Sequence, residues 1–135
     1  MWARPLGGDF YEIHNSPFFA YDLNFLDVVL AISDDPNQKP EIRRVERRSG
    51  HRTLRFRFEA TTERLDRDRM LTQLIALGAT FEGADRTLYA LDIPPNQDYQ
   101  AFCDQLWSWE ESGLLVYETC EARVPGSFDG APQDS

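Results

Sequence analysis

One aspartate and two histidines are the side chains of this sequence whose types could support catalysis or metal binding. Asp27 begins a continuous apolar run, His14 ends a predicted strand, and His51 lies beside a predicted turn. Asp27 could act as a ligand or as an acid–base partner of His51. It could equally accept hydrogen bonds from backbone N–H groups of the turn before it, and the sequence favours this structural role. A zinc site would need a third ligand, and neither cysteine lies near these residues in the sequence.

Other reactive motifs are missing from the sequence. The serines lack a nucleophile-elbow pattern, and Gly7 and Gly8 form only a pair rather than a phosphate-binding loop. Cys103 and Cys120 lie in apolar patterns without a Cys-x-x-Cys pair, which predicts buried, reduced thiols. We therefore expect a protein that is not an enzyme and that holds no metal or cofactor.

Charge is strongly segregated along the chain. Residues 87–135 hold nine carboxylates against a single base, Arg123, which gives a net charge of −8 within an overall −9. Residues 42–57 hold seven arginines against one glutamate, Glu46, which gives +6. Such segregation governs long-range potential and association rate rather than fold. It predicts that the protein recognises a basic protein partner through an acidic surface.

The acidic half offers one surface with the character of a binding site. Trp107 lies near the edge of the apolar stripe of a predicted helix, and carboxylates surround it. An aromatic side chain flanked by charge is typical of an interface hot spot, although Trp107 could instead pack against the N-terminal half. A second acidic site lies in a predicted turn of the N-terminal half. The predicted partner-binding residues are Asp104, Trp107, Glu110, Glu111, Asp34 and Asp35.

The arginine-rich stretch is a weaker candidate for a nucleic-acid site. RNA-recognition sheets stack bases on outward-facing aromatics, whereas here the outward positions of residues 53–58 are Arg55 and Arg57. The acidic remainder of the chain would also repel a phosphate backbone. We therefore expect no nucleic-acid binding, and expect these arginines to join the two halves and to pair with Glu118 or Glu121 across a sheet.

The second half of the chain has clear periodicity. Alternation predicts strands over residues 53–58 and 87–93, with shorter strands over 79–82 and 114–120. Apolar residues at helical spacing predict helices over 66–77 and from 98 to about 112, each followed by a glycine, Gly78 and Gly113. The order β-α-β-β-α-β is that of a ferredoxin-like sandwich.

The first half lacks helical periodicity. Strand-like runs cover residues 10–14, 27–33 and 41–48, which predicts a small antiparallel β half-barrel packed on the sandwich. The predicted organisation of this α+β chain is therefore a β lobe over residues 1–50, a ferredoxin-like lobe over 51–122 and a flexible tail over 123–135.

Length and composition bound the remaining possibilities. The chain has 135 residues, of which 41% are hydrophobic and 13% aromatic, enough for a real core. The first residues lack the apolar region of a signal peptide, and no apolar run approaches the ~20 residues that cross a bilayer. We expect a cytoplasmic protein without membrane contact, a monomer or an oligomer of undetermined size.

Three separated motifs resemble a bacterial group, domain-of-unknown-function family 4265. An "N-x-P-F-F-A" element lies at residues 15–20, a "G-D-V-V" strand at 26–29 and an "S-G-H-x-T" turn at 49–53. The "L-x-A-L-G" helix end at 74–78 and the "L-Y-A-L-D-I-P" strand at 88–94 extend the resemblance over most of residues 2–120. Leu26 departs from the pattern, which favours glycine there, so we expect a differently built turn before Asp27.

The family resemblance brings no reaction with it. It implies a bacterial, cytosolic protein, some of whose relatives lie beside toxin genes as immunity proteins. Combined with the charge pattern, it favours an immunity protein that neutralises a cognate toxin by covering a basic active-site cleft. The alternative is a sensing or regulatory module that binds a small molecule between the two lobes.

Overall fold

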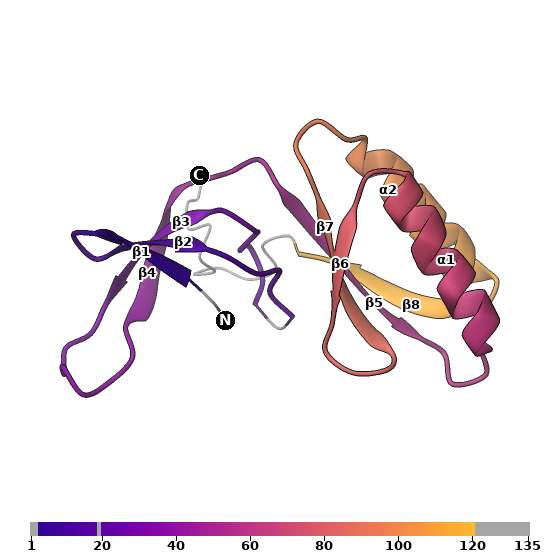
Figure 1. Ribbon diagram of the computed structural model, residues 1–135, viewed down its shortest axis with the longest axis horizontal. Coiled ribbons are helices and arrows are strands. Elements are labelled where there is room, and N and C mark those ends of the chain that lie inside the picture. Colours follow the sequence, from indigo (N-terminus) through magenta and orange to yellow (C-terminus); the bar gives the residue numbers. More distant parts are fainter. Residues whose placement is uncertain (1–2, 19, 121–135) are drawn as a thin grey trace.

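The computed structural model describes residues 3–18 and 20–120, which form two antiparallel sheets and two helices (Figure 1). The predicted mixture of helices and antiparallel strands is therefore confirmed. The N-terminal sheet has four strands in chain order, β1 (Ala3–Gly7), β2 (Phe10–Ile13), β3 (Val28–Ile32) and β4 (Glu41–Arg47). The C-terminal sheet has the order β6-β7-β5-β8, with β5 (Arg52–Phe58), β6 (Thr80–Gly83), β7 (Leu88–Ile93) and β8 (Leu115–Thr119).

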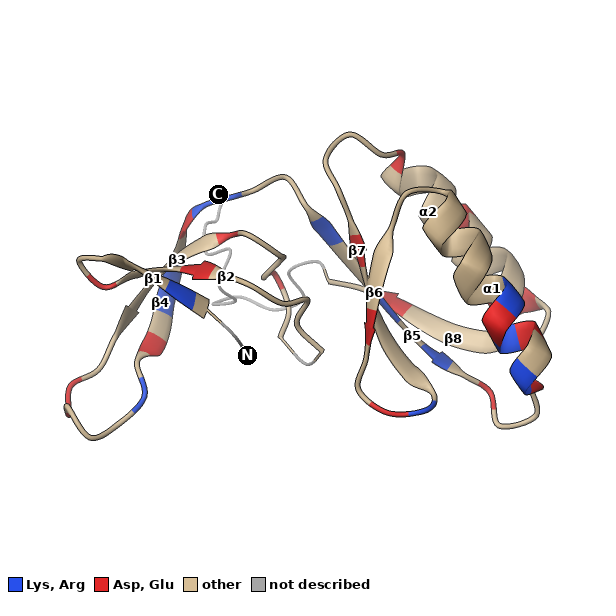
Figure 2. Cartoon of the chain, viewed as in Figure 1, with Lys and Arg blue, Asp and Glu red and all other residues tan. Residues whose placement is uncertain are grey.

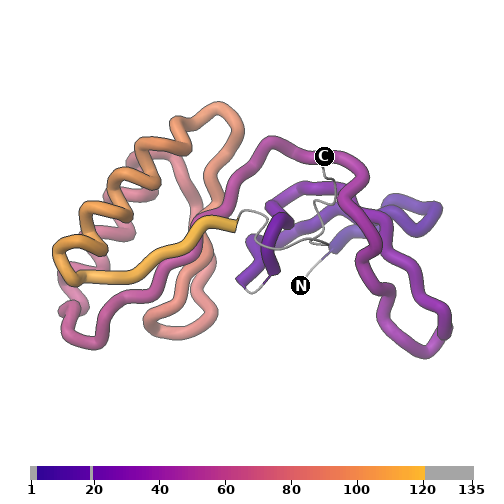
Figure 3. The backbone as a smooth tube through the Cα atoms, turned by 180° about the vertical axis from the view of Figure 1, so that it is seen from behind, coloured from indigo at the N-terminus to yellow at the C-terminus, as the bar shows by residue number. Residues whose placement is uncertain are grey.

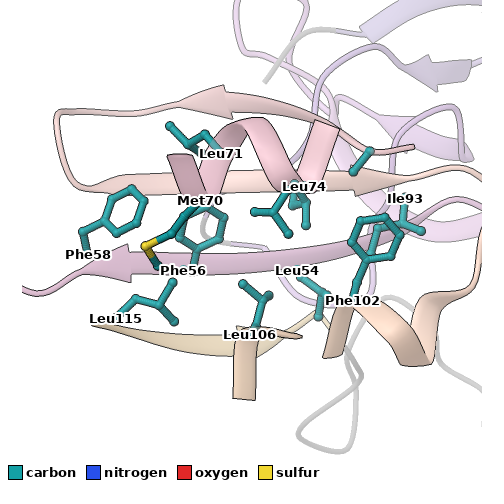
Figure 4. Close-up of a cluster of buried hydrophobic side chains, with 12 residues drawn as sticks. Leu54, Phe56, Phe58, Met70, Leu71, Leu74, Ile93, Phe102, Leu106 and Leu115 are labelled. Carbon is teal, nitrogen blue, oxygen red and sulfur yellow. The ribbon is translucent and has the colours of Figure 1, made fainter. Parts of the chain in front are cut away.

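The C-terminal core follows directly from the alternation of β5. Leu54, Phe56 and Phe58 point to one face of the sheet, and α1 (Arg64–Ala76) and α2 (Tyr99–Glu111) cover that face (Figure 4). Twelve buried hydrophobic residues from the sheet and both helices form one cluster. This cluster fixes the orientation of α2 and therefore decides which of its side chains face outward.

The helix ends were predicted accurately where the sequence contains a capping residue or a terminal glycine. Asp98 caps α2 by accepting a hydrogen bond from the backbone N–H of Ala101 at 3.2 Å. At the end of α1, Gly78 has a φ of +106°, as expected of a residue that follows a helix. The start of α1 lies two residues before the predicted position, because the preceding residue, Glu63, makes no side-chain cap that could signal it.

The N-terminal sheet has a much smaller core, in which Ile13, Leu23 and Val29 are the fully buried members. Its first strand, β1, was not predicted from the sequence. All five of its residues are exposed, so they carry no apolar alternation, and pairing with β2 alone defines the strand. Leu26 adopts a φ of +66°, a left-handed backbone conformation that glycine adopts at a lower cost.

The two lobes meet where the connection between β2 and β3 covers the outer face of the C-terminal sheet (Figure 3). Arg55 points away from the helices and is almost completely buried in contact with this segment, and Ala90 and Asp92 on the same face are buried as well. At the end of β8, the carbonyl of Cys120 accepts a hydrogen bond from the N–H of Asp22 at 2.7 Å. The predicted boundary at residue 50 falls between β4 and β5, and the predicted tail lies outside the described residues.

The two cysteines have free thiols, but only Cys120 is fully buried. Cys103 is half-buried because it lies on the flank of α2, packed against the edge of the core cluster. Burial raises the pKa of the Cys120 thiol, which makes it less reactive. No helix within the described residues is long and apolar enough to cross a membrane.

Candidate functional site

Helix α2 presents the predicted partner-binding residues on its outer side. Phe102 and Leu106 anchor the inner side in the core, while Asp104, Trp107 and Glu111 are exposed. The spacing of three and four residues places these three side chains on one helical face. We call them the α2 acidic face. Helix α2 contains no lysine or arginine, and its charged positions are all acidic in Figure 2.

Trp107 is the central residue of the α2 acidic face. Its side chain is 56% exposed, so it does not pack against the N-terminal lobe. Asp104 accepts a hydrogen bond from the amide of Gln100 at 2.9 Å, one turn earlier on the same face. The exposed indole of Trp107 thus lies beside the carboxylates of Asp104 and Glu111 on the outward side of α2.

Glu110 has a different role from its neighbours. Its Oε1 accepts a hydrogen bond from the backbone N–H of Tyr117 at 2.9 Å, and its side chain is half-buried between α2 and β8. The structure therefore separates Glu110 from the α2 acidic face. Sequence reasoning grouped it with Glu111 because the two are adjacent, although a helix turns by about 100° between them.

The second predicted acidic site is far from the first. Asp34 and Asp35 lie in the connection between β3 and β4, at the opposite end of the molecule from α2 (Figure 2). Asp34 is 3.5 Å from Arg43, and Oδ1 of Asp35 accepts from the N–H of Asn37 at 2.9 Å. These contacts are those of a polar loop, and the two acidic sites cannot touch one compact partner surface together.

The histidine and aspartate candidates do not form a common site. His51 pairs through Nδ1 with Asp92 at 2.9 Å, and His14 pairs through Nε2 with Glu12 at 2.7 Å. The ring of Phe25 lies between the two histidines, 5.3 Å from His51 and 6.5 Å from His14. The described residues contain no group of three or more potential ligands arranged around a metal position.

Asp27 has the structural role that the sequence favoured. Its carboxylate is fully buried and accepts from the backbone N–H groups of Asn24 at 3.0 Å and Ser49 at 2.9 Å. Nη1 of Arg48 lies 3.3 Å from the same carboxylate. Asp27 thus joins the turn before β3 to the end of β4, and its oxygens are committed to these donors.

Asp92 is the buried carboxylate with the most unusual environment. It lies on the outer face of β7, opposite the helices, and its burial raises its pKa. The neighbouring His51 works in the opposite direction and lowers the pKa of Asp92. The pair resembles the orienting half of a catalytic triad, but neither predicted partner, Asp27 or His14, is bonded to it.

Arg55 is the principal polar link between the lobes. Nη1 donates to the carbonyls of Pro17, at 3.1 Å, and Ala20, while Nη2 lies 3.0 Å from Oε2 of Glu118. Its guanidinium carbon lies 4.7 Å from the centre of the Tyr21 ring. The predicted pairing of Arg55 with Glu118 is confirmed, as is the expectation that an arginine of this stretch joins the two halves.

Beside this link, an open groove of about 310 Å³ separates Phe18 and Tyr21 from the outer face of the C-terminal sheet. Apolar side chains from both lobes line it, together with two arginines and one glutamate. The lining residues outside the core are Phe18, Tyr21, Arg55, Arg57, Leu88, Val116 and Glu118. Sequence reasoning expected a groove between the lobes but did not name these residues. The aromatic run before residue 22 was the available signal.

Comparison with known proteins identifies the family of this chain and supports its fold. The model of a domain of unknown function, DUF4265, matches residues 1–117. The chain belongs to the DUF4265 family. The crystal structure of a hypothetical protein from Neisseria gonorrhoeae is similar to this DUF4265 chain, with a TM-score of 0.71 and 17% sequence identity. The match covers 83% of this chain and 75% of the other, and it supports the fold alone. No curated protein matches this DUF4265 chain significantly.

Proposed function

We propose that this DUF4265 protein is a binding protein that holds a basic protein partner against the α2 acidic face. The observation that supports this most directly is Trp107, which is 56% exposed at the centre of a face flanked by Asp104 and Glu111. Large aromatic side chains act as anchors in interfaces, and surrounding charge guides the approach of the partner.

In the most specific version of this proposal, the protein is an immunity protein and its partner is a cognate bacterial toxin. Toxins that act on nucleic acids or nucleotides have basic active-site clefts, which an acidic protein can reach rapidly and cover. The overall charge of −9 favours such an encounter. In this proposal the protein is not an enzyme and acts in the cytoplasm, and its N-terminal half-barrel and ferredoxin-like sandwich act as a scaffold for α2.

The test is to measure binding to the protein encoded by the neighbouring toxin gene. Asp104→Lys with Glu111→Lys should lower the association rate roughly ten- to a thousandfold at low salt, because both charges guide the encounter. Trp107→Ala should instead raise the dissociation rate, since an anchoring side chain acts mainly after contact. Glu110 should be left unchanged, because its bond to Tyr117 supports the fold.

Asp34→Lys with Asp35→Lys is a charge-matched control in the distant β3–β4 connection. Its association rate should stay close to that of the wild type. A loss of binding in this variant, with full binding in the α2 variant, would place the partner on the N-terminal lobe. Unchanged melting temperatures for both variants would show that the comparison reports on binding, because exposed charges usually alter stability by no more than about 0.5 kcal/mol.

The groove between the lobes favours a second candidate function, a sensing module. Its volume of about 310 Å³ and its mixed apolar and charged lining suit a small organic acid or a similar metabolite. Val116, which is exposed in this groove, offers a test. A metabolite that raises the melting temperature of the wild type but not of Val116→Trp, which fills the groove, would support this function. A shift of equal size in both proteins would exclude the groove as its site.

A further inference from the structure

A second hollow lies between the first turns of α1 and the connection of β6 to β7. It is separate from both the α2 acidic face and the groove between the lobes. Its volume is about 700 Å³, and its lining consists of Thr62, Arg64, Arg67, Asp68, Arg86 and Tyr89. Three arginines thus face one aspartate in a protein that has 23 acidic residues and 14 basic ones. Figure 2 shows basic positions at the start of α1 and in the β6–β7 connection.

Arg67 is fixed in the wall of this hollow by backbone carbonyls. Nε donates to Thr62 at 2.7 Å, and Nη2 donates to Glu59 at 3.2 Å. Nη1 lies at 3.5 Å from the carbonyl of Arg86, and the guanidinium carbon lies 5.5 Å from the centre of the Phe58 ring. These contacts connect α1 to the two flanking loops, so Arg67 supplies a positive charge whose position does not depend on a ligand.

Arg64 and Arg86 are different, because their guanidinium groups make no hydrogen bond or ion pair with any residue in the described part of the chain. Other exposed arginines of this lobe do have acidic neighbours: Arg69 pairs with Asp66 at 3.0 Å, and Arg57 lies 3.7 Å from Asp85. Acidic partners are abundant in this protein, and yet two arginines beside one hollow lack them. Their donors are available to an external anion.

We propose that this hollow, the α1 arginine groove, binds the phosphate monoester or diphosphate group of a soluble small molecule. A guanidinium presents paired N–H donors that match the oxygens of a phosphate, and such charge-assisted bonds are roughly twice as strong as neutral ones. Arg64 on α1 and Arg86 in the β6–β7 connection supply these donors, and the fixed charge of Arg67 lines the same hollow. Binding the anion also relieves the repulsion among the three cations.

The remaining lining indicates that the ligand extends beyond its phosphate. A volume of about 700 Å³ is in the range of sites for small organic molecules and exceeds what a phosphate alone fills. Tyr89 forms one wall, and its ring is held by Phe56, stacked at 5.5 Å, and by Phe58 at 5.6 Å. Its hydroxyl makes no hydrogen bond within the described residues. A rigid aromatic wall with an available hydroxyl suits a polar or ring-containing body attached to the phosphate.

The test is a titration of the full chain with inorganic phosphate, inorganic pyrophosphate and phenyl phosphate, followed by calorimetry and by amide chemical shifts. Arg64→Gln with Arg86→Gln should weaken the binding of all three probes at least tenfold, and the melting temperature without probe should stay unchanged because neither side chain supports the fold. Arg43→Gln with Arg69→Gln removes the same charge from two arginines outside the groove and should change affinity less than twofold.

Saturable shifts confined to residues 62–68 and 85–89 would support the proposal. Non-saturable binding, or an equal loss of affinity in both double variants, would show that the probes respond only to overall charge and would overturn it. Tighter binding of phenyl phosphate than of inorganic phosphate would support a ligand with a ring, and equal affinity would remove Tyr89 from the site. None of these outcomes depends on the α2 acidic face, so the test is independent of the function proposed above.

Discussion

The two sheets have four antiparallel strands each, but different forces hold them. A cluster of twelve buried hydrophobic residues supports the C-terminal sheet, whereas the corresponding cluster of the N-terminal sheet has three. The N-terminal sheet relies instead on the buried carboxylate of Asp27 and on the β2–β3 connection, which packs on the outer face of the C-terminal sheet. A small sheet can thus be stabilised by buried hydrogen bonds and by a larger lobe when its own core is insufficient.

The largest expected effect comes from the C-terminal core. Leu106 is fully buried between α2 and the sheet, so Leu106→Ala should lower the free energy of unfolding by about 3 to 5 kcal/mol. Hydrogen exchange should become faster in both sheets, because the N-terminal sheet is stabilised by its packing against the C-terminal sheet. Leu65→Ala, at a residue that is 76% exposed, is the control and should have little effect. Retained protection in β2 and β3 would show that the N-terminal sheet is independent.

Removing the charge of Asp27 should have a smaller and more local effect. In Asp27→Asn, one amide oxygen replaces a carboxylate that serves Asn24, Ser49 and Arg48, which should cost about 3 kcal/mol. Hydrogen exchange should accelerate in β3 and β4 and remain slow in β5 and β7.

Asp34→Asn is the matched control, since Asp34 is exposed, and it should change stability by less than about 0.5 kcal/mol. If hydrogen exchange in Asp27→Asn were accelerated equally in both sheets, the two sheets would not be held by different forces.

Two aspartates of the C-terminal lobe should give opposite pH dependence. Burial raises the pKa of Asp92 above its usual 3.8, so the folded protein binds this proton more tightly than the unfolded chain. The contribution of Asp92 to the free energy of unfolding is fully present below about pH 3.8 and is lost as pH rises through the raised pKa. Relative to Asp92→Asn, the wild type should therefore lose stability as pH rises from about 4 toward neutrality.

Asp85 is the counterpart that faces solvent. Hydrogen bonds from Thr87 and Leu88 lower its pKa from 3.8 to about 2. Its contribution is present above pH 3.8 and is lost as pH falls through about 2, so the wild type should lose stability relative to Asp85→Asn in that window. Denaturant unfolding at several pH values measures both differences. Slopes of the same sign would show that burial does not govern the pKa of Asp92.

The smallest expected effect concerns the turn before β3. Leu26 has a φ of +66°, a conformation that destabilises the folded state by roughly 1–2 kcal/mol for a residue with a Cβ. Glycine avoids this cost, but it loses more conformational entropy on folding, which opposes the gain by about 0.5–1 kcal/mol. Leu26→Gly should therefore stabilise the N-terminal lobe by about 0.5 kcal/mol, measured by denaturant unfolding. Asp9→Gly, at a φ of +68°, is the control and should gain less, because aspartate tolerates this conformation better than leucine. Destabilisation by Leu26→Gly would indicate that the leucine side chain contributes more through packing than its backbone costs.

Elements with a strong periodic signal were predictable from the sequence. Alternation located β5 and β7, and the apolar stripe with Asp98 located α2. Weaker signals gave less: β1, which is exposed throughout, was not predicted, and the start of α1 was placed two residues late because Glu63 makes no side-chain cap. The signals that failed were those that depend on burial of one face or on a capping side chain.

The candidate sites were less predictable because they depend on contacts between distant segments. The sequence grouped Asp104, Trp107, Glu110 and Glu111 on one helix, and the structure leaves Asp104, Trp107 and Glu111 exposed but turns Glu110 toward β8. The burial of Asp92 could not be read from the sequence, since β7 looks the same whether or not its outer face is buried. The α1 arginine groove combines residues 62–68 with residues 86–89, and no pattern along the chain relates these two segments.

The bond between Glu110 and the N–H of Tyr117 also affects how the molecule behaves at high concentration. Strand β8 is at the border of its sheet, where an unpaired backbone invites another chain to add a strand. Glu110 occupies one of these N–H groups and keeps a negative charge beside the border. An incoming strand would have to displace this carboxylate, so the helix that presents the α2 acidic face also protects the sheet against fibril-like stacking.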